Sequence, residues 1–154
     1  MKLESGMKVP AFDRTDDTGA DRSYEDFKGR GLVVYFYPKA FTPGCTGESC
    51  DFRDNHDRFL KAGYAVVGVS PDPTSRLADF RSKYDLPFSL LSDVDHSMAI
   101  AFGAWGLKMN YGREYEGIIR STFVVGADGT IEQAWYNVRA KGHVGRVTGT
   151  VIDG

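Results

Sequence analysis

The stretch YFYPKAFTPGCTGESCDFRD, residues 35–54, joins an apolar run to a polar segment that holds both cysteines of the chain. The run that enters it, LVVYFY at residues 32–37, is continuous, apolar and rich in β-forming residues, and Pro38 ends it. These features predict a buried central strand. Residues 45–62 have helical character, so the stretch spans a strand-to-helix junction. Cys45 then lies at the carboxyl end of a sheet strand, where open α/β folds place their functional sites.

Outward from this junction, the pattern alternates between helix and strand. The helix predicted over residues 45–62 has Gly63 as its stop, and residues 64–70 (YAVVGVS) predict a second buried strand. Another helix follows, for which Asp72 is the expected N-cap and Pro73 a residue of the first turn. The apolar residues expected to face the core from the two helices are Phe52, Phe59, Leu60, Leu77, Phe80 and Tyr84.

The second half of the chain predicts shorter elements. Residues 86–93 (LPFSLLSD) predict a third strand and residues 97–105 a short helix. Residues 106–117, which contain several glycines and tyrosines, predict a loop. Residues 118–125 (IIRSTFVV) predict a fourth strand.

Two turns and the tail complete the pattern. Residues 17–19 (DTG) predict a short hairpin near the N-terminus, and residues 128–129 (DG) predict a hairpin that leads into residues 131–138. From Lys141 onward, valines at helical spacing predict a last helix, although each of its glycines costs about 1 kcal/mol of helix propensity. The order of elements predicts an α/β fold with a central mixed sheet and helices on both faces, in a single domain over residues 1–154.

Composition and charge exclude several classes of function. The chain of 154 residues is long enough to bury its own core. Its 19 Lys and Arg residues against 21 Asp and Glu residues give a net charge of −2, which argues against a nucleic-acid or membrane-surface partner. Neither a signal peptide nor a membrane span is predicted, so we expect a cytoplasmic protein. A close cysteine pair in that setting is more often catalytic, redox-active or metal-binding than a permanent disulfide.

The surroundings of Cys45 favour a reactive thiolate. Free backbone N–H groups and the helix dipole at a helix start stabilise a negative sulfur. Thr42 is close enough to offer its hydroxyl, and Pro43 and Gly44 constrain the approach to the sulfur. Ionisation alone raises the reactive fraction of an ordinary thiol only about thirtyfold at pH 7, whereas one preorganised donor contributes roughly 3 kcal/mol. A fast thiol enzyme therefore needs fixed donors around its second reactant.

The spacing of Cys45 and Cys50 predicts two thiols that stay separate while the helix is intact. Residues five apart on a regular helix have Cα atoms about 8.6 Å apart, and a disulfide requires less than about 7 Å. The pair therefore bonds only if the first turn or two of the helix unwinds. The sequence has no CxxC motif, and His56, His96 and His143 have no ligand spacing with the cysteines, which argues against a metal site.

Residues 35–54 resemble the active-site segment of the peroxiredoxins, in which Pro38, Thr42 and Cys45 match the family's PxxxTxxC pattern. The second cysteine five residues on is similar to the peroxiredoxin Q type, also called bacterioferritin comigratory protein. GVSPDP, LPFSLLSD, FGAWG and RSTFVVGADGTI resemble that subfamily in order, so the likeness covers about residues 7–136. The resemblance implies a thioredoxin-like fold and the reduction of hydrogen peroxide or organic hydroperoxides without a metal, flavin or haem cofactor.

The resemblance also implies a role for each matched residue. Cys45 is the peroxidatic thiol, Cys50 the resolving thiol that forms an intramolecular disulfide with it, and Thr42 and Arg120 are hydrogen-bonding partners of Cys45. Thioredoxin or a similar dithiol protein restores both thiols. We expect a monomer, or a weak homodimer, because resolution within one chain needs no second subunit. The residues expected to shape the site are Pro38, Pro43, Gly44 and Glu48, the last at a position where the family carries Glu or Gln.

Simpler interpretations stay open for single residues. Thr42 alone predicts a helix cap, Glu48 a favourable charge in the first helical turn, and Arg120 a solvated charge at a strand start. For the whole chain, the alternatives to a thiol peroxidase are a general disulfide oxidoreductase and a non-catalytic thioredoxin-like binding or holdase module. Substitution of Cys45 by serine distinguishes them, since only the binding module tolerates it.

Overall fold

The computed structural model describes residues 2–153, in which a seven-stranded mixed sheet has the strand order β2-β1-β5-β4-β3-β8-β9. Two further strands, β6 and β7, pair only with each other. The strands are β1 (Asp13–Asp16), β2 (Asp21–Ser23), β3 (Gly31–Phe36), β4 (Tyr64–Ser70), β5 (Leu90–Ser92), β6 (Trp105–Asn110), β7 (Arg113–Ile118), β8 (Ser121–Val125) and β9 (Ile131–Trp135). The helices are a short 3₁₀ turn η1 (Tyr24–Asp26) and α1 (Pro43–Asp54), α2 (His56–Lys61), α3 (Thr74–Tyr84), α4 (Ser97–Ala101) and α5 (His143–Val151).

Strand β3 is an interior strand of the sheet, next to the middle strand β4, and it is buried as its apolar sequence predicts. All six of its residues are buried, because β4 pairs with it in parallel on one side and β8 pairs with it antiparallel on the other. A strand that is covered on both faces has no polar alternation, which is the pattern of residues 32–36. Side chains of β3 therefore reach two separate cores.

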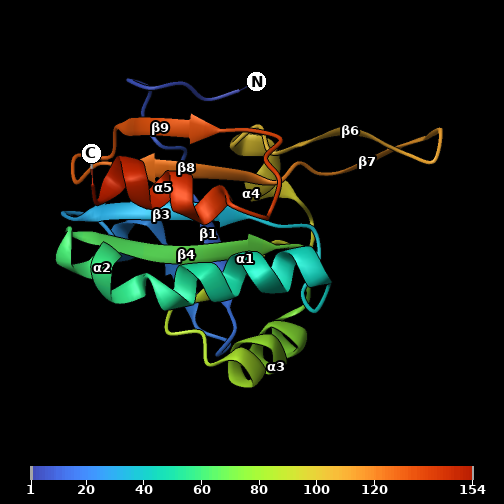
Figure 1. Ribbon diagram of the computed structural model, residues 1–154, viewed down its shortest axis with the longest axis horizontal. Coiled ribbons are helices and arrows are strands. Elements are labelled where there is room, and N and C mark those ends of the chain that lie inside the picture. Colours follow the sequence, from blue (N-terminus) through green and yellow to red (C-terminus); the bar gives the residue numbers. More distant parts are fainter. Residues whose placement is uncertain (1, 154) are drawn as a thin grey trace.

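Helices cover both faces of the sheet, as predicted (Figure 1). On one face α1, α2, α3 and α5 pack against Val33 and Tyr35 of β3. On the other face α4 packs against Val34 and Phe36. The two faces are thus both apolar, which is the mixed α/β arrangement expected from the order of elements.

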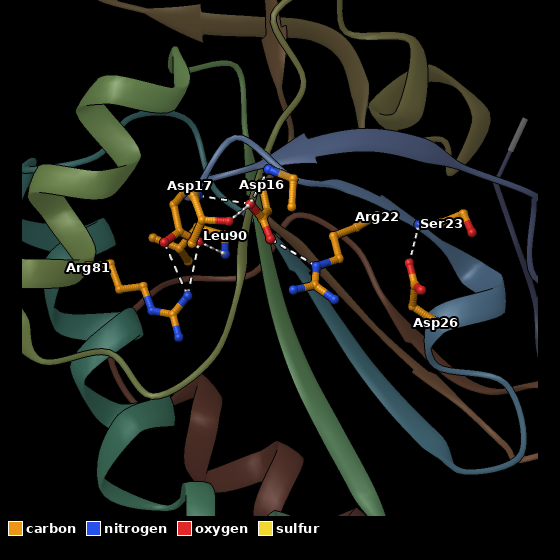
Figure 2. Close-up of polar contacts among 9 residues, drawn as sticks. Asp16, Asp17, Arg22, Ser23, Asp26, Arg81 and Leu90 are labelled. Carbon is orange, nitrogen blue, oxygen red and sulfur yellow. Dashed lines mark hydrogen bonds and ion pairs between the residues drawn. The ribbon is translucent and has the colours of Figure 1, made fainter.

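Two adjacent carboxylates hold the hairpin of β1 and β2, because Asp17 joins it to the body of the fold and Asp16 braces it internally (Figure 2). The carboxylate of Asp17 accepts hydrogen bonds from Nη1 of Arg81 on α3, at 3.1 and 3.2 Å, and from the backbone N–H of Leu90 on β5, at 3.1 Å. The neighbouring Asp16 is fully buried and accepts from Nε of Arg22 at 2.9 Å. The hairpin predicted at residues 17–19 is confirmed, and these polar contacts explain why a strand so poor in apolar residues stays in the sheet.

The helix predicted over residues 45–62 is wrong in extent. Helix α1 begins two residues earlier, at Pro43, and Asn55, which has a non-helical φ of −108° and ψ of 5°, separates it from α2. The break rotates α2, so that Phe59 is fully buried whereas Leu60 is 47% exposed, although both were expected in the core. Gly63 ends α2 as predicted, with a φ of +89° that favours glycine.

Asp72 does not cap α3, in contrast to the prediction. Pro73 occupies the N-cap position, and Asp72 is buried, where its carboxylate accepts from the backbone N–H of Ala40 at 2.7 Å and from the hydroxyl of Ser70 at 2.8 Å. A buried carboxylate with two donors is satisfied in place, so it is not free to turn toward the helix start.

The loop predicted over residues 106–117 is instead a hairpin of two six-residue strands, β6 and β7. Only Tyr111 and Gly112 form the turn, and both have positive φ, as the central residues of a type I′ hairpin turn do. Gly106 and Gly117 face each other across the ladder and do not break it. The same region shortens the predicted helix over residues 97–105, because α4 ends at Ala101 and β6 begins four residues later.

Three other strands are shorter than predicted: β5 covers residues 90–92 of 86–93, β8 covers residues 121–125 of 118–125, and β9 covers residues 131–135 of 131–138. The last turn and the last helix agree with the prediction. The turn at residues 128–129 leads from β8 into β9, and α5 forms in spite of its glycines because Val144 and Val147 are buried against the sheet. Packing thus outweighs weak propensity in this helix. Among the described residues, no helix combines the length and the apolar character needed to cross a membrane.

Candidate active site

Cys45 lies where β3 delivers the chain to the start of α1. Thr42 is the N-cap residue and Pro43 is the first helical residue, so Cys45 is in the first turn, where backbone N–H groups have no carbonyl partner within the helix. The side chain of Cys45 is buried, with only 1% of its surface exposed. A proline at the first position costs no hydrogen bond and starts the helix sharply, which fixes the position of the sulfur.

The loop between β3 and α1 is fixed by contacts with α3 and its N-terminal segment. Phe41 has a φ of +70°, a left-handed conformation that is uncommon outside glycine. Its ring packs against Phe80 at 5.2 Å between centroids and under the guanidinium of Arg76 at 4.9 Å. The preceding residue, Ala40, donates its N–H to Asp72. These contacts hold the turn that aims Thr42 and the helix start.

Arg120 reaches Cys45 because of the antiparallel register of β3 and β8. Phe36, the last residue of β3, pairs with Ser121, the first residue of β8, so the residue before Ser121 lies beside the end of β3. The guanidinium of Arg120 donates from Nη2 to Sγ of Cys45 at 3.2 Å and from Nη1 to Oε1 of Glu48 at 2.6 Å. One cation therefore bridges the sulfur and a carboxylate of the same helix, and Arg120 is not a solvated charge.

Glu48 is a buried partner of this cation. Its side chain is fully buried, and its second oxygen, Oε2, has no hydrogen-bond partner among the described residues. Burial raises the pKa of Glu48 to about 7, although the charge and hydrogen bond of Arg120 act in the opposite direction. For Arg120, burial opposes the charge, but Glu48 and Cys45 together raise its pKa. The cation is therefore permanent, and Glu48 titrates near neutral pH.

Cys50 lies on the same helix and is not bonded to Cys45. Both thiols are free, and Cys50 is half-buried. Burial raises the pKa of Cys50, with a smaller opposite effect from Arg53. Because α1 is continuous from Pro43 to Asp54, helix geometry keeps the two Cα atoms about 8.6 Å apart, which is too far for a disulfide. Bond formation requires that the helix between them unwinds.

A cleft of about 500 Å³ lies beside Arg120, which contacts Sγ of Cys45. Pro38 and Arg120 line its floor, and Leu107 and Met109 of β6, which are 69% and 67% exposed, line its wall. The hairpin that carries them projects from the end of the sheet at which α1 begins (Figure 1). A larger hollow of about 710 Å³ lies beside β1. Neither cysteine lines either hollow, but Arg120, the hydrogen-bond partner of Cys45, lines the smaller cleft.

Three residues predicted from the sequence occupy the site in different ways. The hydroxyl of Thr42 donates to the carbonyl of Lys39 at 2.7 Å, not to Cys45 as expected, and it does not cap the helix. The loop therefore sets its orientation. Gly44 packs against Arg120, and a Cβ at this position would lie 3.5 Å from Nη2, an ordinary contact. Pro43 is at the helix start as expected.

The sequence did not predict the buried residues that hold α1 against the sheet. Tyr35 of β3 and Ser49 of α1 form a buried hydrogen bond of 2.8 Å. Tyrosine at a core position of a strand predicts such a partner, because a buried hydroxyl requires one, but its identity depends on how α1 packs. The left-handed backbone of Phe41 left no signal in the sequence. Among residues 2–153, no group of three or more His, Cys, Asp or Glu side chains is arranged to hold a metal ion.

Comparison with known proteins decides the family. A model described as the AhpC/TSA family matches residues 5–134. The chain belongs to this family. It is 51% identical over 146 residues to a putative peroxiredoxin of Mycobacterium tuberculosis, covering 95% of this chain and 93% of that protein. It is 44% identical to the peroxiredoxin Bcp of Bacillus subtilis, with 99% and 98% of the two chains covered.

Solved structures agree with this assignment. The fold is similar to that of Xanthomonas campestris peroxiredoxin Q, with a TM-score of 0.88 and 35% identity over 97% of each chain. A mutant of Xylella fastidiosa peroxiredoxin Q gives a TM-score of 0.91 at 29% identity, with 97% of this chain and 96% of that chain covered. The protein is thus a peroxiredoxin of the bacterioferritin comigratory protein type, which is a thiol-dependent peroxidase with a thioredoxin-like fold.

Proposed function

We propose that this peroxiredoxin reduces hydroperoxides through Cys45 and resolves the product with Cys50 of the same chain. The observation that carries the proposal is the 3.2 Å contact from Nη2 of Arg120 to Sγ of Cys45 in the first turn of α1. A permanent cation beside the sulfur offers a donor to an oxygen that becomes negative beside that sulfur.

In the first step, the thiolate of Cys45 attacks the terminal oxygen of the hydroperoxide. The O–O bond breaks, the sulfur is oxidised to a sulfenic acid, and the leaving oxygen takes a proton and departs as water or an alcohol. Arg120 and the free N–H groups of the first turn stabilise the charge that moves onto the leaving oxygen. The bridge to Glu48 orients the guanidinium before the substrate arrives.

In the second step, the first turns of α1 unwind and the thiol of Cys50 attacks the sulfur of Cys45. An S–S bond forms, the S–O bond breaks, and water leaves with the proton of the thiol. Loss of burial on unwinding lowers the pKa of Cys50 toward its ordinary value, which increases its thiolate fraction at the moment of attack.

An external dithiol protein of the thioredoxin type then reduces the disulfide by exchange. Resolution within one chain supports a monomer as the working unit, and two cores on opposite faces of one sheet support a single domain. The bacterioferritin comigratory protein of Xanthomonas campestris, a structural neighbour of this chain, has alkyl peroxide reduction activity. The exposed Leu107 and Met109 at the cleft support organic hydroperoxides as substrates here as well.

The sequence alternatives fit the site less well. A general disulfide oxidoreductase must offer its attacking sulfur to a protein disulfide, whereas Cys45 is buried behind Arg120. A binding or holdase module needs neither the cation nor a free thiol in the first turn of α1.

Steady-state peroxide consumption with thioredoxin, thioredoxin reductase and NADPH tests the proposal. We expect no turnover for Cys45→Ser. We expect Cys50→Ser to complete a single peroxide reduction but to stop there, because thioredoxin has no intramolecular disulfide to reduce. Sustained turnover of Cys50→Ser at the wild-type rate would remove Cys50 as the resolving residue, and turnover of Cys45→Ser would remove Cys45 as the peroxidatic one.

A further inference from the structure

A buried hydrogen bond joins the middle of α1 to strand β3. The hydroxyl of Tyr35, on β3, lies 2.8 Å from Oγ of Ser49, on α1. Both residues are fully buried. Ser49 is adjacent to Cys50 in sequence and lies four residues after Cys45, inside the segment that must unwind before the two sulfurs can meet.

The surroundings of Tyr35 hold its ring in this position. The ring stacks on Phe52 of α1 at 4.5 Å and on Tyr37 at 5.5 Å between centroids. Gly68 on the neighbouring strand leaves room for it, because a Cβ there would lie 2.8 Å from Cζ and 2.9 Å from the hydroxyl oxygen of Tyr35. Burial also raises the pKa of Tyr35, so the hydroxyl keeps its proton. The ring therefore holds a protonated hydroxyl within hydrogen-bond distance of Ser49 on α1.

Unwinding of α1 must break this contact. When residues 45–50 leave the helix, Ser49 moves with them, and the hydroxyl of Tyr35 loses its partner in an apolar core. A buried donor without a partner is costly, so the hydrogen bond favours the helical state. It acts on the unwinding step, since among the described residues the side chains of Tyr35 and Ser49 form no hydrogen bond with the side chain of Cys45, Arg120 or Glu48.

We propose that the Tyr35–Ser49 hydrogen bond is a latch that sets how long the sulfenic acid of Cys45 lasts before Cys50 attacks it. The inference rests on the proposed function. Two reactions compete for that sulfenic acid. Cys50 converts it to a disulfide and water, whereas a second hydroperoxide oxidises it to a sulfinic acid and is itself reduced to an alcohol or water. A stronger latch lengthens the time in which the second reaction can occur.

The latch can be opened from either end. Tyr35→Phe removes the hydroxyl but keeps the ring stack, and Ser49→Ala removes the partner. We expect each variant to form the disulfide about fivefold faster after oxidation by one equivalent of peroxide, the factor that one net hydrogen bond supplies. The double variant should be no faster than the faster single variant, because both substitutions remove the same bond. Ser49→Thr, which keeps a hydroxyl, should restore the slow rate.

Two further readouts separate a latch from general loosening of the fold. The peroxide-dependent oxidation of Cys45 should keep its second-order rate constant in Tyr35→Phe, while the fraction of Cys45 overoxidised per turnover falls about fivefold. Of the dithiol and disulfide forms, the latch stabilises only the dithiol. Its loss should therefore make the reduction potential of the disulfide more negative by about 20 mV, which corresponds to a fivefold change in equilibrium constant.

Tyr24→Phe is the matched control. The hydroxyl of Tyr24 is also buried but has no hydrogen-bond partner among the described residues, and Tyr24 lies against the core on the opposite face of the sheet. We expect its disulfide formation to match the wild type.

The experiment is quench-flow with thiol alkylation and mass analysis of wild type, Tyr35→Phe, Ser49→Ala, Ser49→Thr and Tyr24→Phe. Faster disulfide formation in the first two variants, with Ser49→Thr and Tyr24→Phe unchanged, supports the latch. Wild-type rates in Tyr35→Phe and Ser49→Ala would overturn it, and equal acceleration by Tyr24→Phe would overturn it too. If the wild type forms no disulfide between Cys45 and Cys50, the proposed function fails, which is a separate outcome from an unchanged rate.

Discussion

The guanidinium of Arg120 contacts both a sulfur and a carboxylate, and at the scale of single residues the proposed chemistry rests on these two contacts. Nη2 donates to Cys45 and Nη1 to Glu48, with the carboxylate fully buried. An isolated buried carboxylate would be expensive. The contact between Glu48 and Arg120 therefore has two effects: it offsets the cost of burying the carboxylate, and it orients the guanidinium.

Replacement of Arg120 by methionine should slow the oxidation of Cys45 by hydrogen peroxide about 100-fold, because one preorganised donor at a reacting centre is worth this much. It should also destabilise the fold by about 3 kcal/mol, since Glu48 is left without its cation. Stopped-flow oxidation and urea unfolding measure the two effects.

The double variant Arg120→Met/Glu48→Gln separates these effects. It should recover most of the stability but none of the peroxide rate. Recovery of the rate in the double variant would show that Arg120 acts on the fold and not on the reacting oxygens.

The titration of Glu48 predicts an unusual pH dependence of stability. Its pKa in the folded protein is about 7, raised by burial from an ordinary value of 4.5. Between these two values the folded state holds a proton that the unfolded state has released, so the free energy of unfolding should fall as pH rises from about 4.5 to about 7, by up to about 3 kcal/mol. Urea unfolding of wild type and Glu48→Gln across this range measures it. A slope that persists unchanged in Glu48→Gln would assign it to another group.

At the scale of elements, α1 carries the reduced site, and in the proposed mechanism it is also the element that unwinds. Its first turn supplies the free N–H groups and Cys45, and its second turn carries Glu48, Ser49 and Cys50. Glu48 is therefore not in the first turn, in contrast to the prediction. Disulfide formation should therefore unwind the same residues, 45–50, that form the site in the dithiol protein. We expect hydrogen exchange of residues 45–50 to accelerate at least tenfold in the disulfide form and to stay slow in oxidised Cys50→Ser. Equal protection in both redox forms would contradict the unwinding step.

Helix α5 contributes a second pH-sensitive group. His143 is fully buried at its start, where Nε2 lies 2.7 Å from Oγ1 of Thr122. Burial, followed by the charges of Arg146 and Arg120, lowers the pKa of His143 to about 4. The imidazole binds a proton near pH 6.5 in the unfolded state but only near pH 4 in the folded state. The free energy of unfolding should therefore fall as pH falls from about 6.5 to about 4.

Because the slopes of His143 and Glu48 have opposite signs, they partly cancel in the wild type. In a Glu48→Gln background, we expect a loss of about 2 kcal/mol between pH 7 and pH 5, and we expect His143→Gln in that background to remove most of it. The measurement is the urea midpoint at the two pH values. A loss that survives His143→Gln would exclude this residue as its source.

Long apolar elements could be predicted from the sequence, but elements fixed by polar or backbone contacts could not. Residues 32–37 and 64–70 read as strands because both of their faces are buried. The hairpin of β6 and β7 was missed because its glycines lie within the ladder and its turn is made by Tyr111 and Gly112. The break at Asn55 was missed because the apolar spacing continues across it.

At the scale of the whole molecule, the site depends on a register between strands far apart in the sequence. The pairing of Phe36 with Ser121 brings Arg120 to Cys45, 75 residues away along the chain. No local pattern predicts that register, so the role of Arg120 followed only from resemblance to the peroxiredoxins. Cys45 and its place at the end of β3 followed from the sequence itself. The support from Asp72 and Tyr35 required the packed structure.

The most direct test of the proposed chemistry is the intact mass of reduced protein under non-reducing conditions after addition of one equivalent of hydrogen peroxide, with peptide mapping and a Cys45→Ser control. We expect a rapid loss of two hydrogens, mapped to a bond between Cys45 and Cys50 and absent from the control. Oxidation no faster than that of an ordinary free thiol, or a bond-free product that carries added oxygen at Cys45, would contradict it.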